Sequence, residues 1–262
     1  MRAEAAKVSD RPPRLSVITR PGSGLAVSYV SGTPEVIKPS RSSRARRSGV
    51  RDVGTFGHVA HYFEESPQAA SRPGSVTLVL PDLHLRLETD RGVFSPERID
   101  AGTRVLLETV PPPPADGDLL DLGCGYGPIA LTMASRAPGA TVWAVDVNRR
   151  SVELCQRNAK SAGLDKVRSV HADEMPDDVR FRAIWSNPAI RIGKAALHEM
   201  LTRWLDRLTP DGSAYLVVQK HLGSDSLQRW LGDRGWPTSR LASRSAYRVL
   251  RVDARPADIE TQ

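Results

Sequence analysis

Apolar residues follow two spacings along the chain, and the alternation between the two predicts the fold class. Short apolar runs and strict alternations are typical of strands, whereas apolar residues three and four apart are typical of amphipathic helices. The first spacing predicts strands over residues 75–80, 83–88, 119–122, 141–145, 167–170, 182–185, 214–218 and 247–252. The second predicts helices over residues 98–110, 129–137, 148–162, 194–208 and 222–231. Strands that alternate with helices predict an α/β fold with a doubly wound, mostly parallel sheet whose last strand is antiparallel.

The first two predicted strands form a unit of their own. Leu83, Leu85 and Leu87 alternate with polar residues, and Pro81-Asp82 provides a turn between the two runs. We therefore expect an N-terminal β-hairpin that packs, with the helix over residues 98–110, as an elaboration on the main sheet.

Residues 1–57 differ from the rest in composition, since they are rich in Pro, Ser, Gly and Arg and show little of either spacing. Segments of this kind bury too little apolar surface to offset their conformational entropy. We therefore expect a disordered basic arm over residues 1–57, a folded domain over residues 58–252 and a tail over residues 253–262.

The net charge of +7 lies entirely in this arm. Residues 1–55 hold eleven Lys or Arg and four Asp or Glu, so the remaining residues are neutral as a whole. A basic cluster within the arm suits nucleic-acid phosphates. Its members are Arg41, Arg44, Arg46 and Arg47. A solvated tail, an upstream extension from a misassigned start and an organelle-targeting segment are the other interpretations.

Neither apolar runs nor cysteine spacing indicate a membrane protein, a disulfide framework or a metal site. No run approaches the roughly 18 apolar residues of a membrane-spanning helix, and the N-terminus lacks the apolar core of a secretory signal. The two cysteines, Cys124 and Cys155, have no metal-ligand spacing. We expect a cytoplasmic protein without a bound metal.

Residues Leu119–Gly127 read Leu-Leu-Asp-Leu-Gly-Cys-Gly-Tyr-Gly and predict a strand, a tight turn and the start of a helix. The alternate glycines are Gly123, Gly125 and Gly127. Glycine permits a positive φ and lets a ligand approach the main chain. A dinucleotide fingerprint would have glycine at the position of Pro128, and Asp121 would repel a phosphate. A cationic ligand fits better, and a glycine-rich turn without a ligand is the alternative.

The pattern Asp-x-Gly-x-Gly-x-Gly resembles motif I of the class I S-adenosylmethionine-dependent methyltransferases, whose cofactor carries a sulfonium and an ammonium group. The resemblance implies this cofactor, with Asp121 and the three glycines shaping the pocket for its methionine part. Asp146 follows the next predicted strand, nineteen residues beyond Gly127, and its implied partners are the ribose hydroxyls. Asp173 follows the third strand, and its implied partner is the adenine amino group. The alternatives are an aspartate that only caps the next helix and an ordinary loop acid.

The stretch from Ser186 to Arg191 reads Ser-Asn-Pro-Ala-Ile-Arg and follows the strand predicted over residues 182–185. It resembles motif IV, Asn-Pro-Pro-aromatic, of methyltransferases that act on an exocyclic or amide nitrogen. An amine conjugated with a ring is a poor nucleophile, so its site must hold the NH2 with two acceptors and align the nitrogen lone pair. The side-chain oxygen of Asn187 and the backbone carbonyl of Pro188 can serve as these acceptors. A plain turn is the alternative.

Two residues depart from the motif. Ala189 stands where the second proline is usual, and Ile190 stands where many relatives have an aromatic residue that stacks on the base. We therefore expect a less rigid backbone, and a stacking surface that is missing or supplied by another part of the chain. The candidate aromatic residues are Tyr62, Phe63, Phe94 and Tyr126.

These motifs, together with Gly92-Val93-Phe94-Ser95 and the ending Tyr247-Arg-Val-Leu250, resemble the methyltransferase small-domain family over residues 58–251, in a single-domain form. That family includes 16S ribosomal RNA guanine-N2 methyltransferases and shorter archaeal relatives. The resemblance implies a seven-stranded Rossmann-like sheet, a cofactor pocket closed by the hairpin and by residues 92–95, and Arg191 and Lys194 facing the substrate. A solvated loop is the alternative for these two charges.

The implied reaction is methyl transfer from S-adenosylmethionine to guanine N2 of small-subunit ribosomal RNA, with Asn187 and Pro188 as catalytic residues. RNA is then the expected partner. The alternatives are methylation of a small molecule or a protein amide, and a non-catalytic module that binds the cofactor or RNA.

Overall fold

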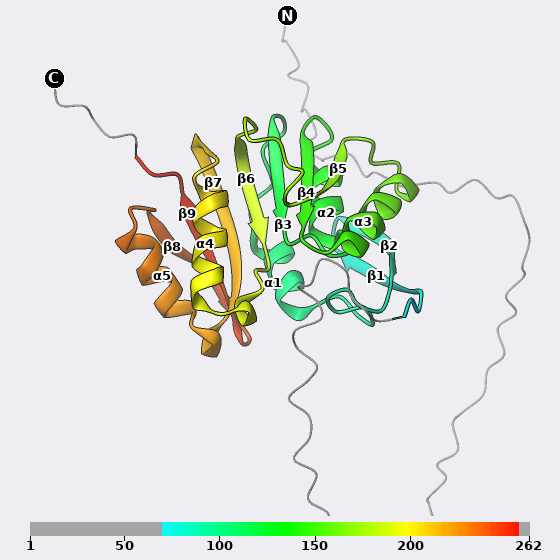
Figure 1. Ribbon diagram of the computed structural model, residues 1–262, viewed down its shortest axis with the longest axis horizontal. Helices are drawn as coiled ribbons and strands as arrows, with labels where there is room; N and C mark the ends of the chain where they lie inside the picture. The colour runs from blue at the N-terminus through cyan, green and yellow to red at the C-terminus, as the bar shows by residue number, and fades with distance from the viewer. Residues whose placement is uncertain (1–69, 257–262) are drawn as a thin grey trace, which may run out of the picture. The chain divides into compact units, whose positions relative to one another are not determined.

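The computed structural model of the chain describes residues 70–256 (Figure 1). The arm predicted over residues 1–57, the candidate aromatics Tyr62 and Phe63, and residues 257–262 of the predicted tail lie outside this range. Within it, none of the helices combines the length and the apolar character that crossing a membrane requires.

A seven-stranded sheet forms the centre of the domain, as the resemblance implies, with the strand order β5-β4-β3-β6-β7-β9-β8. The strands are β3 (Asp118–Leu122), β4 (Thr141–Asp146), β5 (Val167–His171), β6 (Phe181–Ser186), β7 (Leu208–Gln219), β8 (Thr238–Arg244) and β9 (Tyr247–Asp253). Strands β5, β4, β3, β6 and β7 pair in parallel in this order, and β9 runs antiparallel to β7 and β8. The carboxyl ends of the parallel strands therefore meet at one edge, where ligands bind in such sheets.

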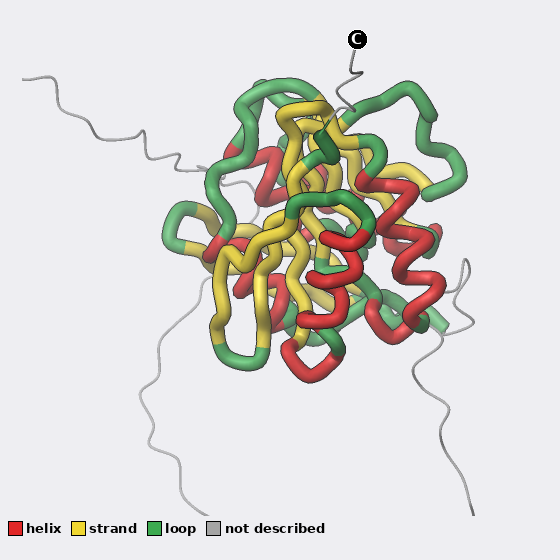
Figure 2. The backbone as a smooth tube through the Cα atoms, turned by 90° about the vertical axis from the view of Figure 1, so that its left-hand side faces the viewer, coloured by secondary structure: helices red, strands yellow, loops and turns green. Residues whose placement is uncertain are grey.

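Helices cover both faces of the sheet, which makes it doubly wound. They are α1 (Ala101–Thr109), α2 (Pro128–Arg136), α3 (Arg149–Ser161), α4 (Lys194–Leu205) and α5 (Ser224–Asp233). One buried apolar cluster joins α1, α2 and α3 to one face, and a second joins α4 and α5 to the other. Figure 2, which views the molecule from the side of β8 and α5, shows helices on both sides of the strands.

The predicted hairpin is present as a separate two-stranded sheet of β1 (Gly74–Leu80) and β2 (Leu83–Thr89). Alternate side chains of both strands are buried in the same cluster as α2 and α3. The buried Asn158 of α3 connects the hairpin to the glycine turn. Its Oδ1 accepts from the Glu88 N–H at 2.7 Å, and its Nδ2 donates to the carbonyls of Glu88 at 3.0 Å and Tyr126 at 2.8 Å. The hairpin is thereby connected to the glycine turn through Asn158.

One strand was not predicted and two helix ends were misplaced, each for a local reason. Strand β8 was missed because most of its residues are exposed and show no apolar alternation. Helix α1 begins at Ala101 because Asp100 caps it, with Oδ2 accepting from the Thr103 N–H at 3.0 Å. Helix α4 ends at Leu205 because Leu208 pairs with Phe181 and opens β7, which is longer than the strand predicted over residues 214–218.

Candidate functional site

Three predicted site segments come together at the carboxyl edge of the sheet. Strand β3 lies between β4 and β6, with Leu122 in register with Val145 on one side and with Ser186 on the other. The glycine turn, Asp146 and Asn187 follow these positions directly. The Ser186 hydroxyl, which is fully buried, donates to the Leu122 carbonyl at 2.7 Å and joins the ends of β6 and β3.

The glycine turn presents bare main chain on one side and close packing on the other. Gly123 and Gly125 have φ of 78° and 54°, and a Cβ at either would meet no atom of residues 70–256 within 4 Å. At Gly127, with φ of 95°, a Cβ would lie 2.7 Å from Cys155 Sγ and 2.8 Å from Leu131 Cδ1. The first two glycines therefore leave room for a ligand against the backbone, whereas the third is required by packing.

Asp121 is completely buried at the end of β3. Its Oδ2 accepts from the Ala130 N–H at 2.8 Å, in the first turn of α2, while its Oδ1 has no hydrogen-bond partner within residues 70–256. Burial raises the pKa of Asp121 to about 8 from its usual 3.8. A cationic group brought close to this carboxyl would favour its charged form, so the turn suits a sulfonium and an ammonium better than a phosphate.

Asp146 links the end of β4 to the glycine turn. Its Oδ2 accepts from the Gly125 N–H at 2.9 Å, and its Oδ1 accepts from the Asn148 N–H at 2.9 Å. Burial raises the pKa of Asp146, and these backbone N–H groups partly offset the effect. The cap of α3 is Asn148, whose Oδ1 accepts from the N–H groups of Arg150 and Ser151. Asp146 is therefore not the residue that caps this helix.

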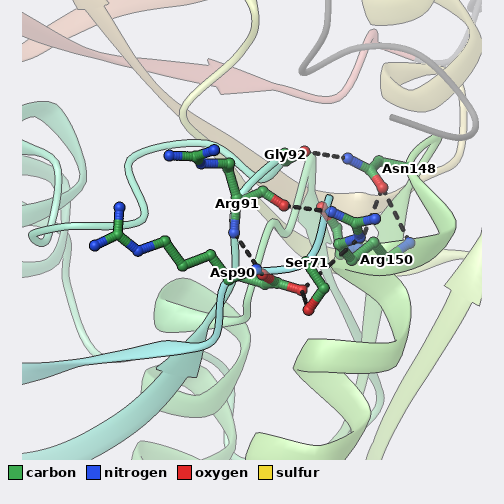
Figure 3. Close-up of polar contacts among 8 residues, drawn as sticks. Ser71, Asp90, Arg91, Gly92, Asn148 and Arg150 are labelled. Carbon is green, nitrogen blue, oxygen red and sulfur yellow. Dashed lines mark hydrogen bonds and ion pairs between the residues drawn. The ribbon is translucent and has the colours of Figure 1, made fainter. Parts of the chain in front are cut away.

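A set of polar contacts ties the segment after β2 to the start of α3 (Figure 3). Asn148 is fully buried, and its Nδ2 donates to the Gly92 carbonyl at 2.8 Å. Arg150 Nη1 donates to the Arg91 carbonyl at 2.6 Å. Asp90 accepts from Ser71 Oγ at 2.7 Å and from the Arg91 N–H at 2.7 Å. These contacts place residues 90–92 beside the turn that carries Asp146.

Sequence reasoning did not find the contact between Asn148 and Gly92. An asparagine at an N-cap position carries a donor that the cap does not use. The unused donor indicated that Asn148 would have a further hydrogen-bond partner, but the sequence does not show which residue accepts this bond.

Asn187 lies just past β6 and is half-buried. Its Nδ2 donates to Asp100 Oδ2 at 2.8 Å and to Thr103 Oγ1 at 3.1 Å, both at the start of α1. Among residues 70–256, no hydrogen-bond donor contacts its Oδ1. This oxygen is not buried, so it remains accessible to solvent. The amide therefore keeps an open acceptor beside the glycine turn.

The backbone after Asn187 forms a regular turn even though Ala189 replaces the usual proline. Ala189 has φ of −71° and ψ of 70°, and the Pro188 carbonyl accepts from the Ile190 N–H at 2.8 Å. These values are those of an inverse γ-turn, and this φ is the one that a proline would impose. Ile190 packs against the α4 and α5 side of the core. A carbonyl has two lone pairs, so Pro188 retains one for a second donor.

Two of the four candidate aromatic residues are described by the structure, and they differ in exposure. Tyr126 is 3% exposed, and its hydroxyl lies 3.4 Å from the carbonyls of Ser95 and Arg98. Phe94, in contrast, is 44% exposed, next to Ser95, which has a positive φ of 49°. Phe94 is therefore the one of these two that offers an open ring face.

The remaining predicted residues lie at the surface. Arg191 and Lys194 are both exposed, in the short 3-10 turn Ile190–Ile192 and at the first position of α4. The Asp173 side chain is 80% exposed, with Oδ1 4.0 Å from Arg203 Nη1 and Oδ2 3.8 Å from His171 Nδ1. Within residues 70–256, no group of three or more His, Cys, Asp and Glu side chains is arranged to hold a metal ion.

This fold, with a glycine turn and acceptors at the ends of β4 and β6, is that of an S-adenosylmethionine-dependent methyltransferase. The family model described as "Methyltransferase small domain" matches residues 84–251. The chain belongs to this family.

Two curated relatives and one solved structure show how far the similarity extends. "Uncharacterized protein YbxB" of Bacillus subtilis (strain 168) is 31% identical over 195 residues, which are 73% of this chain and 97% of that protein. "Ribosomal RNA small subunit methyltransferase C" of Shewanella amazonensis is 29% identical over 190 residues, 70% of this chain and 53% of that enzyme.

The structure of "T. Thermophilus 16S rRNA N2 G1207 methyltransferase (RsmC) in complex with AdoMet and Guanosine" matches with a TM-score of 0.61 and 26% identity. The match covers 72% of this chain and 52% of that one. The chain thus spans about half the length of the methyltransferase C enzymes in this comparison.

Proposed function

We propose that the protein transfers a methyl group from S-adenosylmethionine to N2 of guanine in small-subunit ribosomal RNA. The observation that carries the proposal is the open Oδ1 of Asn187, which lies beside the glycine turn while Nδ2 of the same amide donates to Asp100 and Thr103. The names of the methyltransferase C relatives and the guanosine complex of the solved neighbour support this substrate.

The chain's own groups fit the cofactor at this edge. Gly123 and Gly125 leave open space against the main chain, and Asp121 provides a buried carboxyl for the cationic methionine part. Asp146 would accept from the ribose hydroxyls, and the exposed Val147 beside it offers an apolar contact for a purine. Asp173 is the proposed acceptor for the adenine amino group. When bound, the cofactor supplies a methyl group made electrophilic by its sulfonium.

Asn187 and Pro188 would orient the substrate amine. The Asn187 Oδ1 and the free lone pair of the Pro188 carbonyl accept its two N–H groups, which directs the nitrogen lone pair toward the methyl. The nitrogen–carbon bond forms as the carbon–sulfur bond breaks, and the extra proton on nitrogen then passes to solvent. This scheme needs no strong general base, so alignment accounts for most of the rate gain.

Three exposed residues, Phe94, Arg191 and Lys194, suit a nucleotide within RNA. Phe94 offers an open ring for stacking on a base, and base–aromatic stacking contributes about 1–3 kcal/mol. Arg191 and Lys194 would approach the phosphates of neighbouring nucleotides. Phe94 would then serve in place of the aromatic residue that Ile190 does not provide.

Methyl transfer from isotopically labelled S-adenosylmethionine tests the proposal. The acceptors are 30S ribosomal subunits, naked 16S rRNA, a cell protein fraction and a small-molecule extract, and nucleosides from the RNA samples are identified by mass spectrometry. We expect labelled N2-methylguanosine from at least one of the two RNA samples. Label in another nucleoside, in protein or in the extract would overturn the guanine assignment, and label in none of them would favour a non-catalytic module.

A further inference from the structure

The side chain of Asn187 has two ends of nearly equal shape and opposite chemistry. Oδ1 accepts hydrogen bonds, whereas Nδ2 donates them. Rotating the amide by half a turn would place the donor where the substrate amine needs an acceptor. A group that fixes the rotation of this amide would therefore decide whether the site can hold an NH2.

Asp100 is that group. Its Oδ2 lies 2.8 Å from Asn187 Nδ2, and the Thr103 hydroxyl lies 3.1 Å from the same nitrogen. A hydroxyl can donate or accept and so cannot select one end of an amide, but a carboxylate only accepts. We propose that Asp100 is a positioning residue that turns Oδ1 of Asn187 toward the substrate, an inference that rests on the proposed function.

The start of α1 both binds this carboxylate and leaves room for it. Oδ2 of Asp100 also accepts from the Thr103 N–H at 3.0 Å as the helix cap. A Cβ on Gly102 would lie 2.9 Å from the same oxygen and 2.8 Å from Tyr247 Cε1 on β9. Glycine at this position therefore allows α1 to approach β9 without displacing the Asp100 carboxylate from Asn187.

Helix capping alone does not require this residue. Serine, asparagine and aspartate cap helices about equally well, but a serine hydroxyl is too short to replace the carboxylate at Asn187. Asp100→Ser should therefore preserve α1 while releasing the amide. This separates a positioning role from a structural one.

The first test is independent of any substrate. In the nitrogen-15 spectrum of the full chain, we expect the side-chain NH2 of Asn187 to exchange with solvent at least fivefold faster in Asp100→Ser than in the wild type. The signals are assigned by their absence in Asn187→Ala. Unchanged exchange in a folded Asp100→Ser would overturn the proposal.

The second test reverses the donor and the acceptor. Asn187→Asp places two carboxylates at hydrogen-bonding distance, and we expect kcat to fall at least 30-fold with the KM for S-adenosylmethionine within about twofold. Adding Asp100→Asn places an NH2 where Oδ2 lies, which supplies a donor to residue 187 but gives up the cap from the Thr103 N–H. We expect the double variant to recover at least tenfold of the lost kcat, with the free energy of unfolding measured alongside to account for the lost cap. A double variant no faster than Asn187→Asp would overturn the proposal, and this test still applies if Asp100→Ser fails to fold.

The two tests also separate this proposal from the proposed function. If none of the RNA samples is methylated, the exchange of the Asn187 amide still decides whether Asp100 orients it. If guanine N2 is methylated but the double variant shows no recovery, the function stands and the positioning role does not.

Discussion

The Oδ2 atom of Asp146 accepts a hydrogen bond from the Gly125 N–H at 2.9 Å, which joins the end of β4 to the glycine turn of β3. Both residues belong to the proposed cofactor pocket, so one carboxylate shapes the turn and faces the same ligand.

We expect Asp146→Asn to weaken S-adenosylmethionine binding by about 10- to 100-fold, because hydrogen bonds to a charged acceptor contribute about 1.5–3 kcal/mol. Isothermal titration calorimetry measures the change. Asp116→Asn is the matched control, since this exposed carboxylate precedes β3 at the opposite edge. Equal affinities of Asp146→Asn and the wild type would remove Asp146 from the site.

Two glycine substitutions should separate binding from packing. The new methyl of Gly125→Ala would meet no atom of the described part of the chain within 4 Å. The variant should therefore lower the unfolding free energy by only about 1 kcal/mol, because of its positive φ, while raising the Kd for the cofactor at least tenfold. Gly127→Ala, which meets Cys155 and Leu131 at a positive φ, should destabilise the fold by about 2–4 kcal/mol through overpacking and backbone strain together. Urea unfolding and titration calorimetry on both variants check this. Intact cofactor affinity in Gly125→Ala would contradict the pocket as described.

Asp121 should make the free protein less stable as the pH rises. Its pKa in the folded state, about 8, lies above the ordinary 3.8, so between these values the folded state holds a proton that the unfolded state releases. The contribution is present below pH 3.8, and the unfolding free energy falls by about 1.4 kcal/mol for each pH unit up to about 8. Asp121→Asn should remove this slope. Parallel pH profiles of the wild type and the variant in urea unfolding would refute the buried, protonated state.

The hydrogen bond between Asn148 and Gly92 should hold residues 91–95 beside the proposed cofactor pocket. Asn148→Ser retains a capping oxygen but loses the donor to the Gly92 carbonyl. We expect amide hydrogens of residues 91–95 to exchange about fivefold faster, consistent with a hydrogen bond of about 1 kcal/mol. Hydrogen exchange with mass spectrometry detects this. Ser161→Ala at the far end of α3 serves as the control, and the same protection in both variants would count against the contact.

Much of the fold was predictable because its signals are local. The apolar runs of β3, β4 and β6 and the glycine turn define a doubly wound sheet, and the ends of its parallel strands place Asp146 and Asn187 at one edge. Strand β8 was missed because an exposed edge strand carries no apolar alternation. The neighbouring strand β9, which was predicted, does contain buried residues.

The partners of the site residues were not predictable in the same way. Asp100 and Asn187 are 87 positions apart, and a hydrogen bond between them follows from the packing of α1 on the sheet rather than from any spacing. The sequence did contain a partial signal, because Asp100 followed by a helix is an N-cap pattern. Using it would have placed the start of α1 correctly, but not the contact with Asn187.

The most direct test of the account is the rate of methyl transfer by Asn187→Ala at saturating S-adenosylmethionine, compared with the wild type on small-subunit rRNA. We expect the wild type to form labelled N2-methylguanosine, and the variant to form it at least 100-fold more slowly with its cofactor Kd within about twofold. Formation of this nucleoside by Asn187→Ala at the wild-type rate would show that the end of β6 does not hold the amine, and would contradict the central claim.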